Sequence, residues 1–266
     1  HTEPSCAQRA VCMTASAAVP ALEISGLCKK FGTLVVTQNV DLTLRPGARH
    51  ALIGPNGAGK TTLVNQITGV TKPDAGAIRL FGAEITSTAP ERRVALGVVR
   101  TFQIISLFAR LTVAENLGLA VAAHRSLDAK PWGSLRADDR VVDGVRDLLE
   151  RLDLERFAGR MVSELGYGQR RLVEIALALA LEPKVLLLDE PAAGISSRDL
   201  GRLEATLATL PANVAVLLIE HDMSLVFRFA ERITVLVGGA VLVEGSVEEV
   251  RADQRVRDVY LGRARV

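Results

Sequence analysis

Cysteine is scarce in this sequence. The 266 residues include three, Cys6, Cys12 and Cys28, and two of these lie close to the N-terminus. Their spacing matches none of the common patterns in which cysteine and histidine bind zinc. The cysteines therefore indicate no metal site, and we expect the protein to work in a reducing compartment.

Long hydrophobic runs are also missing, although hydrophobic residues make up 48% of the chain and can fill a sizeable core. The longest nearly apolar stretch has 11 residues, Ile233 to Val243, and it contains Gly238 and Gly239. A membrane-spanning helix needs about 18 or more apolar residues. We therefore expect a chain that does not cross a bilayer by itself.

Neither sign of charge dominates. The formal net charge is +2 and no long basic tract occurs, so charge gives no support for a nucleic-acid partner, and we expect none. Residues 1–20 lack the basic and apolar regions of a secretory signal. We expect a disordered tail over residues 1–20, with a functional arm as the alternative, and one organised domain over residues 21–266.

Strand patterns open the organised part of the chain. Residues 21–32 and 35–47 alternate apolar and polar residues between glycines, which is typical of antiparallel strands. Residues 48–54 read as a short strand, a helix is expected over Lys60 to Ile67, and residues 76–85 are again strand-like. These patterns predict an N-terminal antiparallel β subdomain.

The second half of the chain has other periodicities. Apolar residues recur at helical spacing from about residue 111 to 160, and one predicted helix face carries Val141, Val145, Leu148, Leu149 and Leu152. The runs KVLLLDEP and VAVLLIEHD are continuously apolar and end in acids, which suits strands buried on both faces of a parallel sheet. A hairpin is expected at Gly238-Gly239. Together the patterns predict an α/β fold with a mostly parallel sheet and a helical subdomain over about residues 104–170.

One short segment has the composition of a phosphate-binding loop. It matches the pattern G-x-x-x-x-G-K-[ST] between a predicted strand and a predicted helix. The glycines allow several backbone N–H groups to point inward, and the helix adds the partial positive charge of its N-terminus. We expect Lys60 to reach the β- and γ-phosphates and the Thr61 hydroxyl to face Mg²⁺; a glycine-rich turn without a ligand is the alternative. The predicted nucleotide-binding residues of this segment are Gly54, Pro55, Asn56, Gly57, Ala58, Gly59, Lys60, Thr61 and Thr62.

Two acidic residues, Asp189 and Glu190, follow the apolar run VLLL. The carboxyl ends of strands in an open α/β sheet face the ligand crevice. We expect Asp189 to hold Mg²⁺ through water and Glu190 to orient and polarise the attacking water. Taken alone, two acids in a solvated turn would be the plain alternative. Next to a phosphate-binding loop, they indicate a P-loop NTPase core.

Five motifs in a fixed order resemble those of the ATP-binding cassette (ABC) ATPases of transporters. They are the phosphate-binding loop, Gln103 in VRTFQ, the glycine-rich LGYGQ, LLLDEP, and His221 in LIEHD. The resemblance covers essentially Ala21 to Val266. Further segments, DEPAAGI, LIEHDMSLV, VRDVYLG, the tyrosine of LGYGQ and the insertion after TVAENL, resemble the branched-chain amino acid-type importer ATPases.

The resemblance implies roles for individual residues. Phe31 occupies the place of an aromatic residue that stacks on adenine. Gln103 corresponds to a residue that touches Mg²⁺ and the attacking water, and Thr61, Gln103 and Asp189 form the implied metal set. His221 corresponds to the histidine that contacts the γ-phosphate, so Glu190, His221 and Gln103 form the implied catalytic set. The signature that completes the ATP site of a second subunit corresponds to Leu165, Gly166, Tyr167, Gly168 and Gln169.

Two positions depart from the family pattern. The signature usually begins Leu-Ser, whereas here Leu165 is followed by Gly166, which has no hydroxyl for the partner's γ-phosphate. Backbone N–H groups and a helix N-terminus remain there as anion-binding groups. The loop after DEP usually ends in Asp, or in Asn in this branch, and here the position is Ser196. Both departures concern the site that this chain completes for its partner.

The resemblance also implies a function. It implies an ATPase that uses ATP and Mg²⁺ to power import of a branched-chain amino acid or a related amide or acid. The implied partners are a second ABC ATPase subunit, identical or different, transmembrane permeases and, indirectly, a periplasmic solute-binding protein. The chain would then lie peripherally on the cytoplasmic face of the inner or plasma membrane. A soluble ABC ATPase acting on a protein assembly, such as iron–sulfur assembly, is the alternative. A phosphate-loop kinase would carry no LGYGQRR run.

The segment after Gln103, IISLFARLTVAENL, is more apolar than a soluble surface requires. We predict that Phe108 and nearby residues line a groove for a short cytoplasmic helix of the permease, since a buried aromatic anchor is a common hot spot of such interfaces. The alternative places Phe108 in the core of the helical subdomain.

Overall fold

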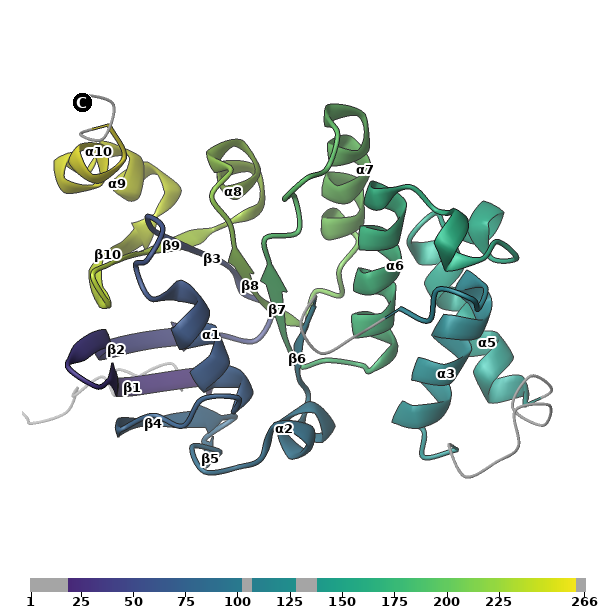
Figure 1. The fold of residues 1–266 in the computed structure, drawn as a ribbon, viewed down its shortest axis with the longest axis horizontal. Coiled ribbons are helices and arrows are strands. Elements are labelled where there is room, and N and C mark those ends of the chain that lie inside the picture. Colours follow the sequence, from purple (N-terminus) through teal and green to yellow (C-terminus); the bar gives the residue numbers. More distant parts are fainter. Residues whose placement is uncertain (1–18, 102–106, 128–137, 262–266) are drawn as a thin grey trace, which may run out of the picture.

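The computed structural model describes residues 19–101, 107–127 and 138–261. Most of the expected N-terminal tail and Gln103 lie outside the described residues. The described chain forms two sheets with helices around them, and α3 and α5 lie together at the end of the molecule away from β1 and β2 (Figure 1). The predicted boundary of a helical subdomain at about 104–170 remains a prediction.

The first sheet is antiparallel, as predicted. Its strands run in the order β2-β1-β4-β5, with bounds Leu22–Phe31 for β1, Leu34–Leu44 for β2, Ala75–Leu80 for β4 and Ala83–Glu84 for β5. The strand-like segment over residues 76–85 forms two strands, β4 and β5, rather than one. Phe81 and Gly82 both have positive φ, 47° and 80°, and this left-handed pair turns the chain into a tight hairpin.

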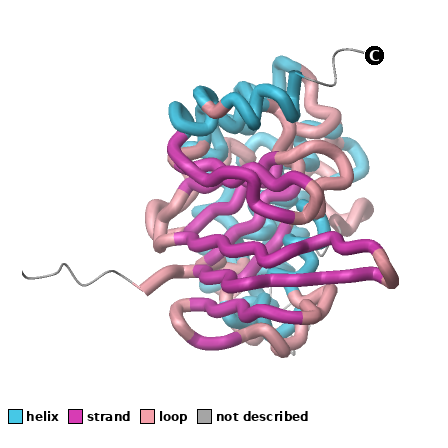
Figure 2. The backbone as a smooth tube through the Cα atoms, turned by 90° about the vertical axis from the view of Figure 1, so that its left-hand side faces the viewer, coloured by secondary structure: helices cyan, strands magenta, loops and turns pink. Residues whose placement is uncertain are grey.

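The second sheet is mostly parallel, which confirms the predicted fold class. Its order is β10-β9-β3-β8-β7-β6, and β10 alone runs antiparallel to its neighbour. Figure 2 shows the strands of both sheets from the side. The predicted hairpin at Gly238-Gly239 joins β9 to β10. The bounds are Arg49–Ile53 for β3, Val98–Arg100 for β6, Val185–Asp189 for β7, Ala215–Ile219 for β8, Arg232–Val237 for β9 and Ala240–Ser246 for β10.

Helices connect and cover the strands. The first, α1, begins at Lys60 directly after the phosphate-binding loop, and α3 begins at Val113 behind a capping box in which Thr112 and Glu115 exchange hydrogen bonds. The bounds are Lys60–Thr68 for α1, Pro90–Leu96 for α2, Val113–His124 for α3, Asp139–Arg151 for α5, Tyr167–Ala180 for α6, Ser197–Ala208 for α7, Met223–Phe229 for α8, Val247–Ala252 for α9 and Gln254–Leu261 for α10; short 3₁₀ turns span Glu155–Phe157 and Val162–Glu164.

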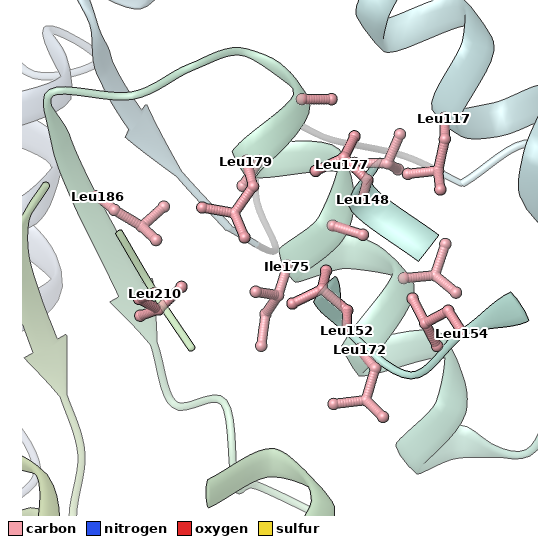
Figure 3. Close-up of a cluster of buried hydrophobic side chains, with 14 of the residues drawn as sticks. Leu117, Leu148, Leu152, Leu154, Leu172, Ile175, Leu177, Leu179, Leu186 and Leu210 are labelled. Carbon is pink, nitrogen blue, oxygen red and sulfur yellow. The ribbon is translucent and has the colours of Figure 1, made fainter. Parts of the chain in front are cut away.

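Two large hydrophobic clusters hold these layers together. One packs α3, α5 and α6 against β7 through leucines such as Leu117, Leu148 and Leu179 (Figure 3). On the predicted apolar face of α5, Leu148, Leu149 and Leu152 belong to this cluster, and Val141 belongs to a smaller one. Val145 is only partly buried and packs against both. The other cluster packs α1, through Leu63 and Ile67, against both sheets. The helix that follows the phosphate-binding loop is therefore held between the two sheets by its buried side chains.

Candidate functional site

The phosphate-binding loop lies between the end of β3 and the start of α1, as the sequence predicts. Gly59 precedes α1 with φ 99°, and a Cβ added there would stand 2.3 Å from the backbone oxygen of Val36. Only glycine fits where β2 passes so closely. The turn between β9 and β10 also supports the loop, since the N–H of Gly239 donates to the oxygen of Ala58 at 2.9 Å.

Lys60 places a buried ammonium inside this loop. Its Nζ donates to the backbone oxygens of Gly54 at 2.7 Å and Pro55 at 3.1 Å. Burial lowers the pKa of Lys60, and the negative charges of Glu190 and Asp189 oppose that shift. No acidic residue lies in the first turn of α1, so the partial positive charge of the helix N-terminus is not neutralised within the helix.

A cavity of about 600 Å³ joins the loop to the predicted acidic residues. Its wall contains Lys60, Thr61, Asp189 and Glu190, together with the loop residues Asn56, Gly57, Ala58, Gly59 and Thr62, whereas the predicted residues Gly54 and Pro55 are not part of it. The remaining wall comes from Leu34, Val35, Val36, Ile219, Gly238 and Gly239. A lysine, two threonine hydroxyls and two carboxylates line one hollow, and this set of groups suits a polyphosphate with its cation.

Magnesium fits the oxygen groups of this wall. Mg²⁺ prefers hydroxyl, carboxylate and phosphate oxygens and usually shares its coordination with substrate phosphates. Thr61 and Asp189 supply such oxygens. Within the described ranges, no group of three or more His, Cys, Asp and Glu side chains could hold a metal ion.

Glu190 has an unusual backbone. It follows the last residue of β7 with φ 47°, in the left-handed region, and its N–H donates to the oxygen of Ile219 at 2.8 Å. Such a conformation costs a non-glycine residue of order 1–3 kcal/mol and is concentrated at functional sites. The surrounding strands therefore fix the direction in which the Glu190 side chain leaves the backbone.

Three other predicted residues are less closely tied to the cavity. Phe31, at the end of β1, is 53% exposed and is not part of the wall, although its strand partner Leu34 is. His221 comes shortly after the end of β8, and its side chain is 62% exposed. Gln103 lies outside the described residues. The roles of these three residues remain predictions.

The signature residues lie apart from the cavity. Leu165 is buried, and Gly166 precedes α6, where its N–H donates to Oε1 of Gln169 at 3.0 Å. A Cβ on Gly168 would stand 2.8 Å from Cβ of Asp199, so α6 and α7 meet closely there. None of the five residues Leu165, Gly166, Tyr167, Gly168 and Gln169 contributes to the cavity wall. Their predicted role toward a second subunit is consistent with this separation.

Ser196 has a local role in the structure. Its hydroxyl donates to Oδ2 of Asp199 at 2.9 Å, and its oxygen accepts from the N–H of Asp199 at the start of α7. Serine is a good residue for this N-cap position. The departure from the family's Asp or Asn therefore retains a capped helix.

Sequence reasoning missed two buried charged residues at the site. Glu220 is completely buried behind His221 and accepts hydrogen bonds from the N–H groups of Ala192 and His221. Arg100 is equally buried and pairs with Asp189. The available signal was positional, because each residue is the charged end of an apolar strand, VVR or AVLLIE, in a sheet whose carboxyl edge faces the ligand.

The fold and the cavity define a P-loop nucleotide-binding cassette. Residues 37–193 match the family described as "ABC transporter", and residues 240–266 match the "Branched-chain amino acid ATP-binding cassette transporter" family. The first match covers more than half of the sequence. The chain therefore belongs to the ABC transporter family, and it is an ABC ATPase.

Relatives and solved structures agree with this assignment. The chain is 41% identical over 254 residues to BraF of Pseudomonas aeruginosa, a high-affinity branched-chain amino acid transport ATP-binding protein, covering 92% of this chain and 99% of the relative. It is 40% identical to LivG of Escherichia coli with the same coverage. The ADP conformation of an ABC transporter cassette superposes with a TM-score of 0.77 at 31% identity, covering 91% and 99% of the two chains. The predicted family, fold and ATPase class are confirmed.

Proposed function

We propose that this chain binds MgATP in the cavity around Lys60 and hydrolyses it to power import of a branched-chain amino acid, or a related amide or acid, through partner permeases. One observation carries the proposal: a single cavity joins the phosphate-binding loop to Asp189 and Glu190. The match of residues 240–266 and the names of BraF and LivG support the importer over a soluble assembly ATPase.

Each residue of the site has a different role in the proposed hydrolysis of ATP. The oxygen of a water attacks the γ-phosphorus, the bond to the β,γ-bridging oxygen breaks, and the water proton passes to Glu190. Lys60 and the loop N–H groups bind the β- and γ-phosphates, and His221 contacts the γ-phosphate. Magnesium, when bound, neutralises the charge that develops on the phosphate oxygens. Thr61 and Asp189 would hold it, with Gln103 as the third predicted group.

A second ATPase subunit would complete each ATP site. Gly166 and Tyr167 are exposed at the start of α6. In the proposed pair, this helix N-terminus faces the partner's γ-phosphate with its backbone N–H groups. A dimeric ABC cassette in a post-hydrolysis state with ADP and Pi is similar to this chain, with a TM-score of 0.70 at 25% identity, covering 85% of this chain and 98% of that one. This likeness supports a paired arrangement, with an identical or a different partner.

An apolar groove on the helical side suits the permease. A hollow of about 630 Å³ lies between α3 and α5, and its wall includes Ala114, Gly118, Val142 and Val145. Phe108 is not in that wall, but the residue is 58% exposed, which argues against a place in the core. We propose that a cytoplasmic helix of the permease packs in this groove and contacts Phe108.

Contact with a permease would place the chain on the cytoplasmic face of the membrane. In the described part of the chain, no helix has both the length and the apolar character needed to span a bilayer.

Reconstitution of the whole transporter tests the proposal. The chain is co-expressed with candidate permeases and a candidate second ATPase, placed in liposomes, and assayed for ATP hydrolysis with a binding protein and leucine or an amide. We expect hydrolysis that depends on the solute. Phe108→Glu and Val142→Glu should no longer bind the permease. Val70→Glu, at an exposed position beyond the end of α1, is the control and should still bind it. Assembly with soluble proteins alone would contradict the importer.

A further inference from the structure

Arg100 joins three elements at the edge of the nucleotide cavity. It ends β6, and its side chain is fully buried. One nitrogen, Nη2, pairs with Oδ2 of Asp189, the carboxylate at the end of β7, and the other, Nη1, donates to Oδ1 of Asn65 on α1 at 2.7 Å. A single cation thus connects the predicted metal carboxylate to the helix that follows the phosphate-binding loop.

The backbones of the two partners are fixed as well. Thr101, the residue after Arg100, donates its N–H to the oxygen of Leu187 at 3.0 Å, and its hydroxyl accepts from the N–H of Asp189 at 3.4 Å. Because both main chains are held, the guanidinium determines the orientation of the Asp189 carboxylate. It engages Oδ2, which leaves Oδ1 as the oxygen for a metal or its bound water.

The guanidinium is not arranged for stability alone. Among the described residues, Nε of Arg100 has no hydrogen-bond partner, and an unmet buried donor is unfavourable. Apolar residues can often replace a buried ion pair without loss of stability. Arg93, equally buried, shows the structural alternative: its three nitrogens donate to the backbone oxygens of Thr86, Thr88, Gln66 and Ile67.

We propose that Arg100 is a positioning residue that orients Asp189 for the magnesium-bound nucleotide and ties this carboxylate to α1. The inference rests on the proposed function, because Asp189 is the predicted metal residue. Groups that hold a metal-binding carboxylate from behind typically change metal affinity or activity by about 10–100-fold when they are removed. Nucleotide binding without metal uses Lys60 and the loop, and it does not need this orientation.

The test compares two dissociation constants of the full-length chain. A fluorescent ATP analogue is titrated in excess Mg²⁺ and again in EDTA, and the ratio of the two constants measures how strongly the metal assists binding. In Arg100→Met we expect this assistance to fall about tenfold or more, while binding in EDTA changes less than about twofold. Arg93→Met is the matched control: it removes a buried arginine beside α1 and should leave the ratio unchanged.

The outcomes separate the inference from the proposed function. If the wild-type chain does not bind the analogue at all, the proposed function fails. If it binds and Arg100→Met has an unchanged or larger magnesium effect, Arg100 is a structural residue or a competing cation, and the inference is overturned. Arg100→Lys serves if the Met variant does not fold: it keeps the charge but cannot reach Asn65 and Asp189 together, and we expect a partial loss, whereas a wild-type ratio would also overturn the inference.

Discussion

The buried carboxylate of Glu220 accepts a hydrogen bond from the N–H of Ala192, 28 residues earlier in the chain, at 2.8 Å. Its other oxygen accepts from the N–H groups of His221 at 2.9 Å and Asp222 at 3.3 Å. One carboxylate therefore holds both the segment after Glu190 and the segment that presents His221. The two loops cannot move apart without leaving buried polar groups unpaired.

Glu220→Gln should reduce turnover with little effect on ATP affinity. The amide has the shape of the carboxylate, but its NH₂ group meets an N–H donor where an acceptor is needed, and an unpaired buried donor costs about 1–3 kcal/mol. We expect about a tenfold lower kcat and an ATP dissociation constant within about twofold, because Glu220 is not in the cavity wall. Glu204→Gln, on α7, is the matched control for loss of a carboxylate. Wild-type turnover in Glu220→Gln would rule out this coupling.

Glu190→Gln and Lys60→Ala should impair different steps: the first should lower turnover, and the second should lower nucleotide affinity. The first change removes charge but not shape from the predicted water-activating position, so MgATP should still bind while most turnover is lost. The second removes the cation that faces the phosphates, so nucleotide affinity should fall. Equilibrium binding and steady-state ATPase assays separate the two. Normal turnover in Glu190→Gln, or normal affinity in Lys60→Ala, would contradict the assigned role.

The sequence predicts those parts of the site whose chemistry depends on local spacing. The phosphate-binding loop requires glycines and a lysine at fixed intervals. Residues 185–188 of β7 and all of β8 are apolar because both faces of these strands are covered, so each of these segments has a recognisable sequence pattern. Arg100 and Glu220 leave none of comparable strength. Their partners, Asp189 and Ala192, are 89 and 28 residues away, and only the packing of β6, β7 and β8 brings them together. The tight turn at Phe81-Gly82 was missed because an aromatic residue rarely adopts positive φ.

Gly166→Ser should increase hydrolysis at the ATP site of the partner subunit. A Cβ on Gly166 would have Oε1 of Gln169 as its nearest neighbour, at 3.8 Å, and φ is −64°, so serine fits without strain. Its hydroxyl could donate to the partner's γ-phosphate, and a hydrogen bond to a charged group is worth about 1.5–3 kcal/mol. We expect roughly a tenfold gain if the contact tightens in the transition state.

The gain from Gly166→Ser should be confined to one site of a heterodimer. Measured in the assembled pair, it should disappear when the catalytic glutamate of the partner is replaced and persist when Glu190 is replaced. Gly168→Ser is the contrasting variant, since a Cβ there meets Asp199 at 2.8 Å and should destabilise the packing of α6 on α7. If Gly166→Ser gives no gain while the partner's glutamate is intact, backbone donors already suffice.

A buried histidine lies on the strand that leads to the phosphate-binding loop. His50 on β3 is 1% exposed, and its Nε2 lies 2.7 Å from Oγ1 of Thr234. The Thr234 hydroxyl donates its proton to Glu244, so the neutral imidazole must donate from Nε2. Burial lowers the pKa of His50 from 6.5 to about 4, although Glu244 raises it and Arg232 lowers it further.

Stability should therefore fall in acid through His50. The folded-state pKa lies below the unfolded value, so the contribution is fully present above pH 6.5 and is lost progressively as the pH falls to about 4. The full loss corresponds to about 3 kcal/mol at 1.36 kcal/mol per pKa unit. His50→Gln keeps an N–H donor for Thr234 and does not titrate. The carboxylates are common to both proteins, so their contribution cancels when the two stability profiles are subtracted. Urea unfolding of the two chains from pH 7.5 to 4.5 should show a steeper loss of unfolding free energy in the wild type. Parallel profiles would show that the pKa of His50 is the same in the folded and unfolded protein, which would contradict the predicted effect of burial.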